Sequence, residues 1–153
     1  MLHDPLTQLP GRTLFSDRLE QALALAARRK SRAAIIALEA ADFDRHFDTQ
    51  RLSGQALLEL SRRIQNDLRL TDSVCRLEGA RFLVLLPDVG TVEAVEAVAE
   101  ELRLHMAREL SVEQRRARLV CRAGSAVFPE DGDAERPLVD KALQRLRGQD
   151  VAD

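Results

Sequence analysis

The stretch Arg76-Leu77-Glu78-Gly79-Ala80-Arg81-Phe82-Leu83-Val84-Leu85-Leu86-Pro87 decides the fold class of this chain. It joins two apolar segments of strand length, Ser73 to Leu77 and Phe82 to Leu86. Only four residues separate these segments, and Gly79 among them tolerates a positive φ. A short polar connection that contains glycine, placed between two apolar runs, predicts an antiparallel β-hairpin.

Helices are expected on both sides of this hairpin. Apolar residues recur at helical spacing over Gln55 to about Leu70 and again over Thr91 to about Leu110. Farther from the hairpin, two apolar segments predict buried strands, over Ala33 to Glu39 and Arg118 to Phe128. Two amphipathic segments predict the outermost helices, over Thr13 to about Lys30 and Leu138 to Leu146. Mixed helices and strands with one tight hairpin predict an α+β fold, in which helices wrap a mostly antiparallel sheet.

Length and composition limit the class of protein. The 153 residues contain no linker, repeat or low-complexity segment, so we expect one domain over 1–153 with a core of about 2–148. The formal net charge is −2, and Tyr and Trp are absent, which gives no support for nucleic-acid binding. The longest apolar runs have strand length and the first residues do not form a signal peptide, so a cytoplasmic location without a membrane span is expected. Cys75 and Cys121 match neither a disulfide framework nor a zinc pattern.

Several motifs follow one another in order along the chain. The hairpin keeps Arg76, Gly79 and Phe82 of a pattern Arg-x-Gly-Gly-Asp/Glu-Glu-Phe. Other segments match further patterns: Asp4-Pro5-Leu6-Thr7-Gln8-Leu9-Pro10-Gly11-Arg12, the strand around Gly124, the turn Val127-Phe128-Pro129-Glu130-Asp131-Gly132, and Val139-Asp140-Lys141-Ala142-Leu143. Together they resemble the GGDEF family of diguanylate cyclases. The resemblance implies a five-stranded central sheet wrapped by helices, related to nucleotide cyclase and polymerase palm domains.

In the GGDEF family, magnesium-binding carboxylates come from an Asp-x-Asp after the first strand and from the third residue of the hairpin motif. The first place reads Glu39-Ala40-Ala41 in this chain, and the hairpin position is Ala80, followed by Arg81. Mg²⁺ requires several hard oxygen ligands in octahedral array. One carboxylate beside a guanidinium is a poor magnesium site, so we expect neither a bound metal nor a cofactor.

The resemblance also implies that recognition of the GTP substrate is lost. The family contacts guanine through an Asn and an Asp, and these positions fall on Phe47 and Gln55. A phenyl ring cannot hydrogen-bond a base edge, and an amide lacks the charge of a carboxylate. We therefore predict no catalytic residue and no enzyme activity. The degenerate positions are Glu39, Ala41, Phe47, Gln55, Glu78, Gly79, Ala80 and Arg81.

One ligand motif of the family is retained. Many members carry Arg-x-x-Asp five residues before the hairpin motif, where it binds cyclic di-GMP as the inhibitory I-site. Arg69-Leu70-Thr71-Asp72 occurs at that offset. A guanidinium can fork onto a phosphate or a guanine edge, and a carboxylate accepts from the guanine donors. The alternative without a ligand is that Arg69 is a cation at the end of a helix, where it suits the helix dipole, and that Asp72 is an ordinary turn residue. The offset favours a cyclic di-GMP receptor with Arg69 and Asp72 as its binding residues.

Two other functions stay open at this point. The domain could be an interaction or dimerisation module without a nucleotide role, because family members often work as dimers or joined to sensory or phosphodiesterase domains. A residual GTP-binding or diguanylate cyclase activity is the third hypothesis. The expected partners are therefore cyclic di-GMP, an attached or separate partner domain, and a second copy of the chain.

Overall fold

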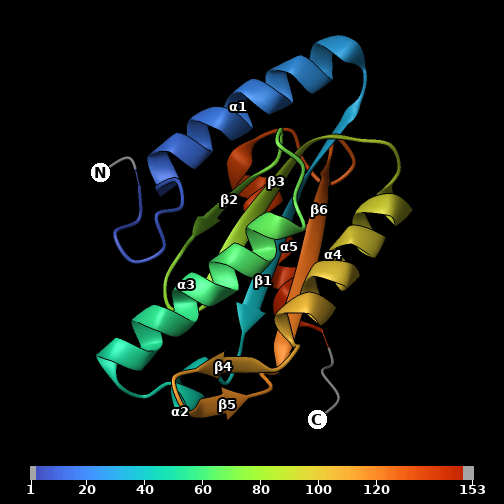
Figure 1. The fold of residues 1–153 in the computed structure, drawn as a ribbon. Helices are drawn as coiled ribbons and strands as arrows, with labels where there is room; N and C mark the ends of the chain where they lie inside the picture. The colour runs from blue at the N-terminus through green and yellow to red at the C-terminus, as the bar shows by residue number, and fades with distance from the viewer. Residues whose placement is uncertain (1–2, 150–153) are drawn as a thin grey trace.

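The structure is a computed structural model that describes residues 3–149. A four-stranded antiparallel sheet in the order β2-β3-β1-β6 forms its centre (Figure 1). The elements in chain order are α1 (Arg12–Arg29), β1 (Arg32–Ala40), α2 (Phe43–His46), α3 (Gln50–Asn66), β2 (Ser73–Arg76), β3 (Arg81–Val89), α4 (Val92–Met106), β4 (Leu110–Val112), β5 (Arg115–Ala117), β6 (Cys121–Phe128) and α5 (Glu135–Arg147).

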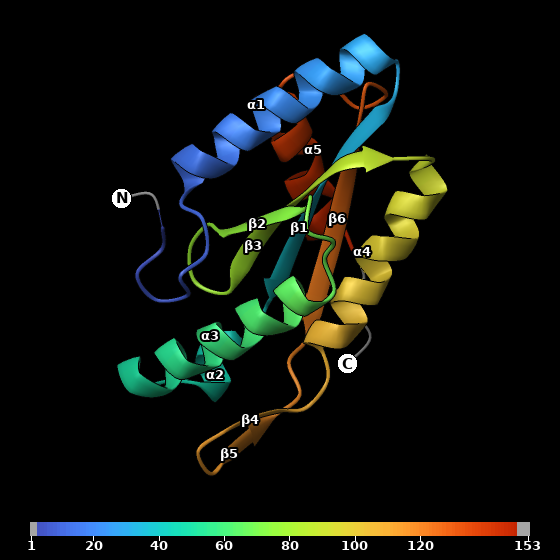
Figure 2. The same ribbon diagram turned by 45° about the horizontal axis from the view of Figure 1, so that its top comes forward.

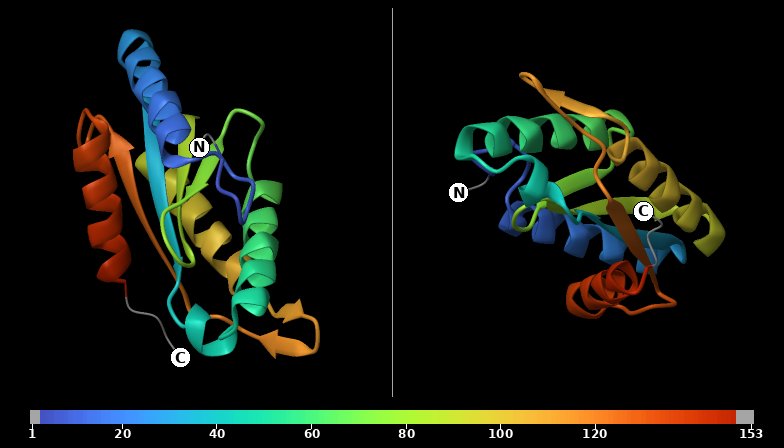
Figure 3. Two further views of the ribbon diagram at one scale, coloured as in Figure 1. Left: turned by 90° about the vertical axis from the view of Figure 1, so that its left-hand side faces the viewer. Right: turned by 90° about the horizontal axis from the view of Figure 1, so that it is seen from below.

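Strand β1 is buried on both of its faces. Its residues Ala33, Ile35 and Ala37 contribute to one apolar core, together with residues of α1 and α5. The alternate residues Ala34, Ile36 and Leu38 contribute to the other core, with residues of α3 and α4. Successive side chains of a strand point to opposite faces, so a central strand covered on both sides must be apolar throughout. Figure 3 shows the resulting three layers, with α1 and α5 on one side of the sheet and α3 and α4 on the other.

The predicted hairpin is confirmed by the pairing of β2 with β3. Arg76 pairs with Phe82, and the connection between the strands contains Gly79 at φ 54°. Glycine adopts this left-handed conformation without the steric cost that a Cβ atom brings. Beyond the hairpin, β3 pairs with β1 over nearly its whole length, which carries the hairpin tip to the end of β1.

Helix α5 approaches β6 closely at Gly124. A Cβ atom on this residue would overlap the backbone nitrogen of Leu146 and the carbonyl oxygen of Ala142. The glycine that the family resemblance places in this strand therefore has a packing role. It allows the last helix to lie directly on the sheet.

The α+β fold with helices around an antiparallel sheet is confirmed, but the strand count of the main sheet differs from the prediction of five. Within residues 3–149 the main sheet has four strands, and β4 and β5 form a separate two-stranded hairpin that extends away from it (Figure 2). The sequence gives no clear signal for this hairpin, because its strands have three residues each. The preceding helix, expected to reach Leu110, ends at Met106.

The boundaries of α3 also differ from the prediction. The helix begins at Gln50 rather than Gln55, because Thr49 caps it by accepting a hydrogen bond from the Leu52 amide at 3.2 Å. It ends at Asn66 rather than near Leu70, so Arg69 lies in the loop before β2. None of the helices within residues 3–149 combines the length and the apolar composition that crossing a membrane requires.

Candidate functional site

A cavity of about 590 Å³ lies where β1 ends beside the tip of the β2–β3 hairpin. Strand pairing brings the two segments together, since Glu39 of β1 is the register partner of Arg81 of β3. We call this space the hairpin cavity. Its lining residues are Glu39, Ala40, Ala41, Phe43, Asp44, Glu78, Gly79, Ala80, Arg81 and Arg122. Six of the eight predicted degenerate positions therefore surround one space.

An ion pair lines the hairpin cavity. Arg81 donates from Nε and Nη2 to Oε2 of Glu39, at 3.0 and 2.6 Å. Arg122 of β6 lies opposite Glu39 on its other side, and its Nε is buried without a hydrogen-bond partner within residues 3–149. The carboxylate of Glu39 thus lies between two arginines on the neighbouring strands. In the part of the chain that the structure describes, no group of three or more His, Cys, Asp or Glu residues is arranged to hold a metal ion.

Phe47 and Gln55, the two positions expected to have lost guanine recognition, do not line the hairpin cavity. Phe47 is only 1% exposed and packs against Phe43, with the ring centroids 5.3 Å apart. Gln55 is exposed on α3. The aromatic residue thus belongs to the hydrophobic core.

Arg69 and Asp72 form a second site in the loop between α3 and β2. Asp72 accepts from Nε and Nη2 of Arg69, at 3.3 and 3.1 Å, and from the Arg69 backbone amide at 2.9 Å. The Asp72 side chain is 3% exposed, whereas that of Arg69 is 58% exposed. The hydrogen bonds to Asp72 raise the pKa of the Arg69 guanidinium. Arg69 also donates to the carbonyl oxygen of Asp88 at 2.9 Å, which ties the loop to the end of β3.

A hollow of about 340 Å³ adjoins this pair beside the edge strand β2. We call it the edge hollow. It is lined by Arg18, Gln21, Ala22 and Leu25 from α1, and by Leu70, Thr71, Asp72, Ser73, Leu85 and Pro87. No motif in the sequence indicates a role for Arg18 here or for Arg122 in the hairpin cavity. Arg18 lies far along the chain from Asp72, and Arg122 lies far from the β2–β3 hairpin, so only the packing of α1 and β6 brings them there.

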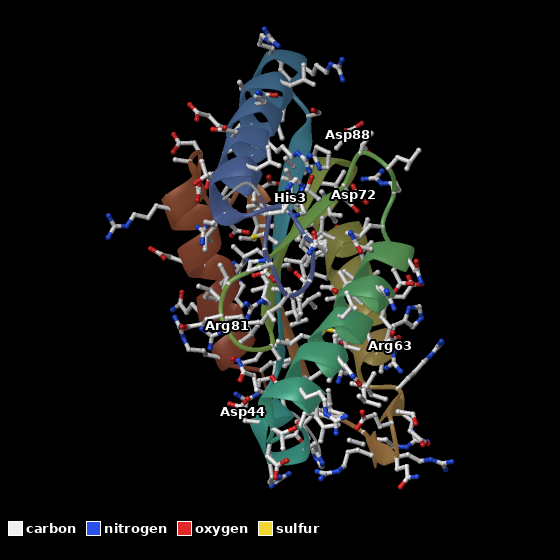
Figure 4. All side chains as sticks on the ribbon, turned by 60° about the vertical axis from the view of Figure 1, so that its left-hand side comes forward. His3, Asp44, Arg63, Asp72, Arg81 and Asp88 are labelled. Carbon is white, nitrogen blue, oxygen red and sulfur yellow. The ribbon has the colours of Figure 1, made fainter. Side chains whose placement is uncertain are left out.

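The two sites lie near opposite ends of β3. Figure 4 shows Arg81 and Asp44 toward one end of the sheet and Asp72 and Asp88 toward the other. Arg81 begins β3 and Asp88 lies next to its last residue. Seven residues at about 3.3 Å each separate the two positions by about 23 Å along the strand. The two sites share no lining residue.

Comparison with known proteins identifies the class to which this fold and these sites belong. The family model described as "Diguanylate cyclase, GGDEF domain" matches residues 1–150. The chain therefore belongs to the GGDEF family. Among solved structures, that of a sensory box/GGDEF family protein from Caulobacter crescentus matches with a TM-score of 0.87 and 27% identity over 96% of each chain.

Curated relatives are found in Pseudomonas aeruginosa. The chain is 32% identical over 153 residues to the bifunctional diguanylate cyclase/cyclic di-GMP phosphodiesterase MucR, covering 97% of this chain and 22% of the relative. It is 34% identical over 155 residues to the diguanylate cyclase DgcP, covering 95% of this chain and again 22% of the relative. The chain spans about a fifth of the length of these two curated relatives.

Proposed function

We propose that this domain is a catalytically inactive GGDEF domain that binds cyclic di-GMP through Arg69 and Asp72. The protein then acts as a receptor or regulatory module in cyclic di-GMP signalling. Binding at this loop is chemically independent of the hairpin cavity, because the two places are separated by the length of β3.

The geometry of Arg69 and Asp72 carries this proposal. The buried carboxylate holds the guanidinium by two hydrogen bonds, so the arginine fork has a fixed position before any ligand arrives. A preorganised group loses less conformational freedom on binding. More than half of the Arg69 side chain is exposed, and Nη1 makes no hydrogen bond within residues 3–149, which leaves this nitrogen for a phosphate or a guanine edge.

The ion pair in the hairpin cavity supports the loss of catalysis. Mg²⁺ needs several hard oxygen ligands, and here Glu39 is bound by Arg81 and flanked by Arg122. Ala41 and Ala80 line the same cavity without offering a side-chain oxygen. Asp44 and Glu78 also line the cavity, but within residues 3–149 no three or more His, Cys, Asp or Glu side chains are grouped so that they could hold a metal ion. The proposal therefore includes no metal cofactor.

The names of the relatives favour a second candidate function. MucR and DgcP are both named as diguanylate cyclases, which favours production of cyclic di-GMP by a domain of this kind. An incubation with GTP and Mg²⁺ or Mn²⁺ distinguishes the two functions. The receptor proposal expects no cyclic di-GMP in the products.

The proposed receptor needs a recipient for its signal. MucR is named as a protein that combines cyclase and phosphodiesterase functions, and it is several times longer than this chain. We place the recipient in an attached or separate sensory or phosphodiesterase domain in the cytoplasm. Self-association of the domain through its helices stays a prediction of the family resemblance.

Calorimetric titration with cyclic di-GMP tests the receptor proposal. The wild-type domain is expected to bind, and Arg69→Ala is expected to weaken binding at least 10-fold, because a charge-assisted hydrogen bond contributes about 1.5–3 kcal/mol. Arg62→Ala is the matched control, since Arg62 is an exposed arginine of α3 that pairs with Glu59. No binding by the wild type, or equal binding by Arg69→Ala, would refute the proposal.

A further inference from the structure

One face of α1 forms a wall of the edge hollow. Arg18, Gln21, Ala22 and Leu25 line it. Their spacing of three, four and seven residues places them on one side of a helix. The opposite wall is the segment from Leu70 to Ser73, which includes Asp72. A ligand held by Asp72 and reaching into the hollow therefore meets α1.

The charges in the edge hollow favour an anion. Asp72 and Arg18 are its charged lining residues, and Asp72 is already paired with Arg69. The positive charge of Arg18 is thus the uncompensated charge of the lining. Within residues 3–149 the side-chain hydrogen bond of Arg18 goes from Nη1 to the neutral hydroxyl of Ser73, at 3.2 Å. A guanidinium has five N–H donors, so most of its donors stay available.

We propose that Arg18 binds a phosphate of cyclic di-GMP and is a third binding residue of the site formed by Arg69 and Asp72. This inference rests on the proposed function. Cyclic di-GMP carries two phosphodiester charges, and Arg69 and Arg18 supply one guanidinium each. The apolar lining residues Ala22, Leu25 and Leu70 offer a surface for the face of a guanine ring.

The size and position of the hollow agree with this assignment. Its volume of about 340 Å³ is near the lower end of the range of small-molecule sites. It holds part of a cyclic dinucleotide, and the remainder lies over the exposed Arg69. Ser73 is buried and holds the Arg18 guanidinium beside the Asp72 loop, so the arginine is oriented before the ligand arrives.

Titration of the whole domain with cyclic di-GMP tests the role of Arg18. The Arg18→Ala variant is expected to bind about 10-fold more weakly than the wild type, because one charge-assisted contact is lost. Arg18→Lys keeps the charge without the fork and is expected to retain part of the affinity. Arg29→Ala removes another exposed arginine of α1, outside the edge hollow, and is expected to bind within twofold of the wild type.

The salt dependence of binding separates a phosphate contact from a structural role. Salt screens a contact between Arg18 and a phosphate, because the Debye length falls from about 14 Å at 50 mM NaCl to about 6 Å at 300 mM NaCl. Over this range the dissociation constant of the wild type should therefore rise more steeply than that of Arg18→Ala. A residue that only supported the fold would leave this slope unchanged. Thermal unfolding of each ligand-free variant confirms that it is folded.

The outcomes separate this inference from the receptor proposal. Weaker binding and a shallower salt dependence in Arg18→Ala, with Arg29→Ala unchanged, would support the phosphate contact. Binding by Arg18→Ala equal to the wild type, with binding lost in Arg69→Ala, would overturn the role of Arg18 and leave the receptor proposal standing. No binding by the wild type would overturn both.

Discussion

The guanidinium of Arg81 on β3 binds the carboxylate of Glu39 on the adjacent strand β1, with Nη2 2.6 Å from Oε2. The pair occupies the place where the family resemblance expects magnesium ligands. Strand register fixes this contact, because the two residues are direct partners across the sheet. A single cross-strand ion pair thus links the fold of the domain to the proposed loss of its chemistry.

The energy of this ion pair is measurable by a double-mutant cycle. We expect a coupling free energy of about 1 kcal/mol from Arg81→Ala, Glu39→Ala and the double variant. Both side chains are partly buried, and the hydrogen bonds between them are charge-assisted. Urea denaturation gives the free energies of unfolding. The exposed pair of Arg62 and Glu59 serves as control and is expected to couple by less than about 0.5 kcal/mol. Equal coupling in the two cycles would contradict this prediction.

The ion pair between Asp4 and Arg76 predicts a dependence of stability on pH. Burial raises the pKa of the Asp4 carboxyl, but hydrogen bonds from Arg76 and Thr7 outweigh that effect and leave this pKa below its ordinary value of 3.8. The contribution of a carboxyl with a lowered pKa is complete above its unfolded pKa and is lost as the pH falls through its folded pKa.

We therefore expect Asp4→Asn to be less stable than the wild type at pH 7, by about 1–2 kcal/mol. This difference should shrink as the pH falls below 3.8, the ordinary pKa of this carboxyl, and through its lowered pKa in the folded protein. Chemical denaturation over a pH series measures it. Asp17→Asn, which changes an exposed aspartate of α1, controls for the loss of one negative charge. A difference that stayed constant down to pH 2 would count against the role of Asp4.

The close approach of α5 to β6 makes Gly124 the position most sensitive to a small substitution. Gly124→Ala forces a methyl group onto the backbone of Ala142 and Leu146, which must move apart. We expect a loss of about 3 kcal/mol in the free energy of unfolding, at the upper end for overpacked cores. Gly90→Ala is the control, because no heavy atom lies within 4 Å of its Cβ position, and should change stability by less than about 0.5 kcal/mol. Similar losses in both variants would refute the packing role.

The two cysteines are expected to be unreactive in the folded domain. Cys75 and Cys121 are both buried, and burial raises the pKa of each thiol to about 12. The thiolate is the reactive form, and little of it exists at about pH 8 while the thiols are buried. A colorimetric thiol reagent at about pH 8 should therefore modify neither residue in the folded domain, and should modify both in about 6 M urea, where the unfolded chain exposes them. Rapid modification of the native domain would contradict the burial of these two thiols.

Much of the fold could be predicted from local sequence. The hairpin at Gly79 and the apolar runs that became β1 and β6 are strong local signals, and the structure confirms them. The β4–β5 hairpin was not predictable in this way, since three residues per strand are too few to establish an alternating pattern. The early start of α3 depends on the cap at Thr49, which a search for apolar periodicity does not detect.

The candidate sites, like the fold, could be predicted from the sequence only in part. The family resemblance implied that Glu39, Ala41, Ala80 and Arg81 lie together, and all four line one cavity. The sequence could not indicate that Arg18 faces the loop of Asp72, because the spacing on α1 defines a helix face but not the element that this face meets. Contacts of this kind depend on the packing of whole elements.

Incubation of the purified domain with GTP and Mg²⁺ or Mn²⁺, followed by chromatographic detection of cyclic di-GMP, tests the central claim most directly. DgcP, a relative that is named as a diguanylate cyclase, provides the positive control in the same assay. With Arg81 bound to Glu39 where metal ligands are required, the account predicts unchanged GTP and no cyclic di-GMP. Cyclic di-GMP formed by the wild-type domain, and lost on chelation of the metal, would contradict it.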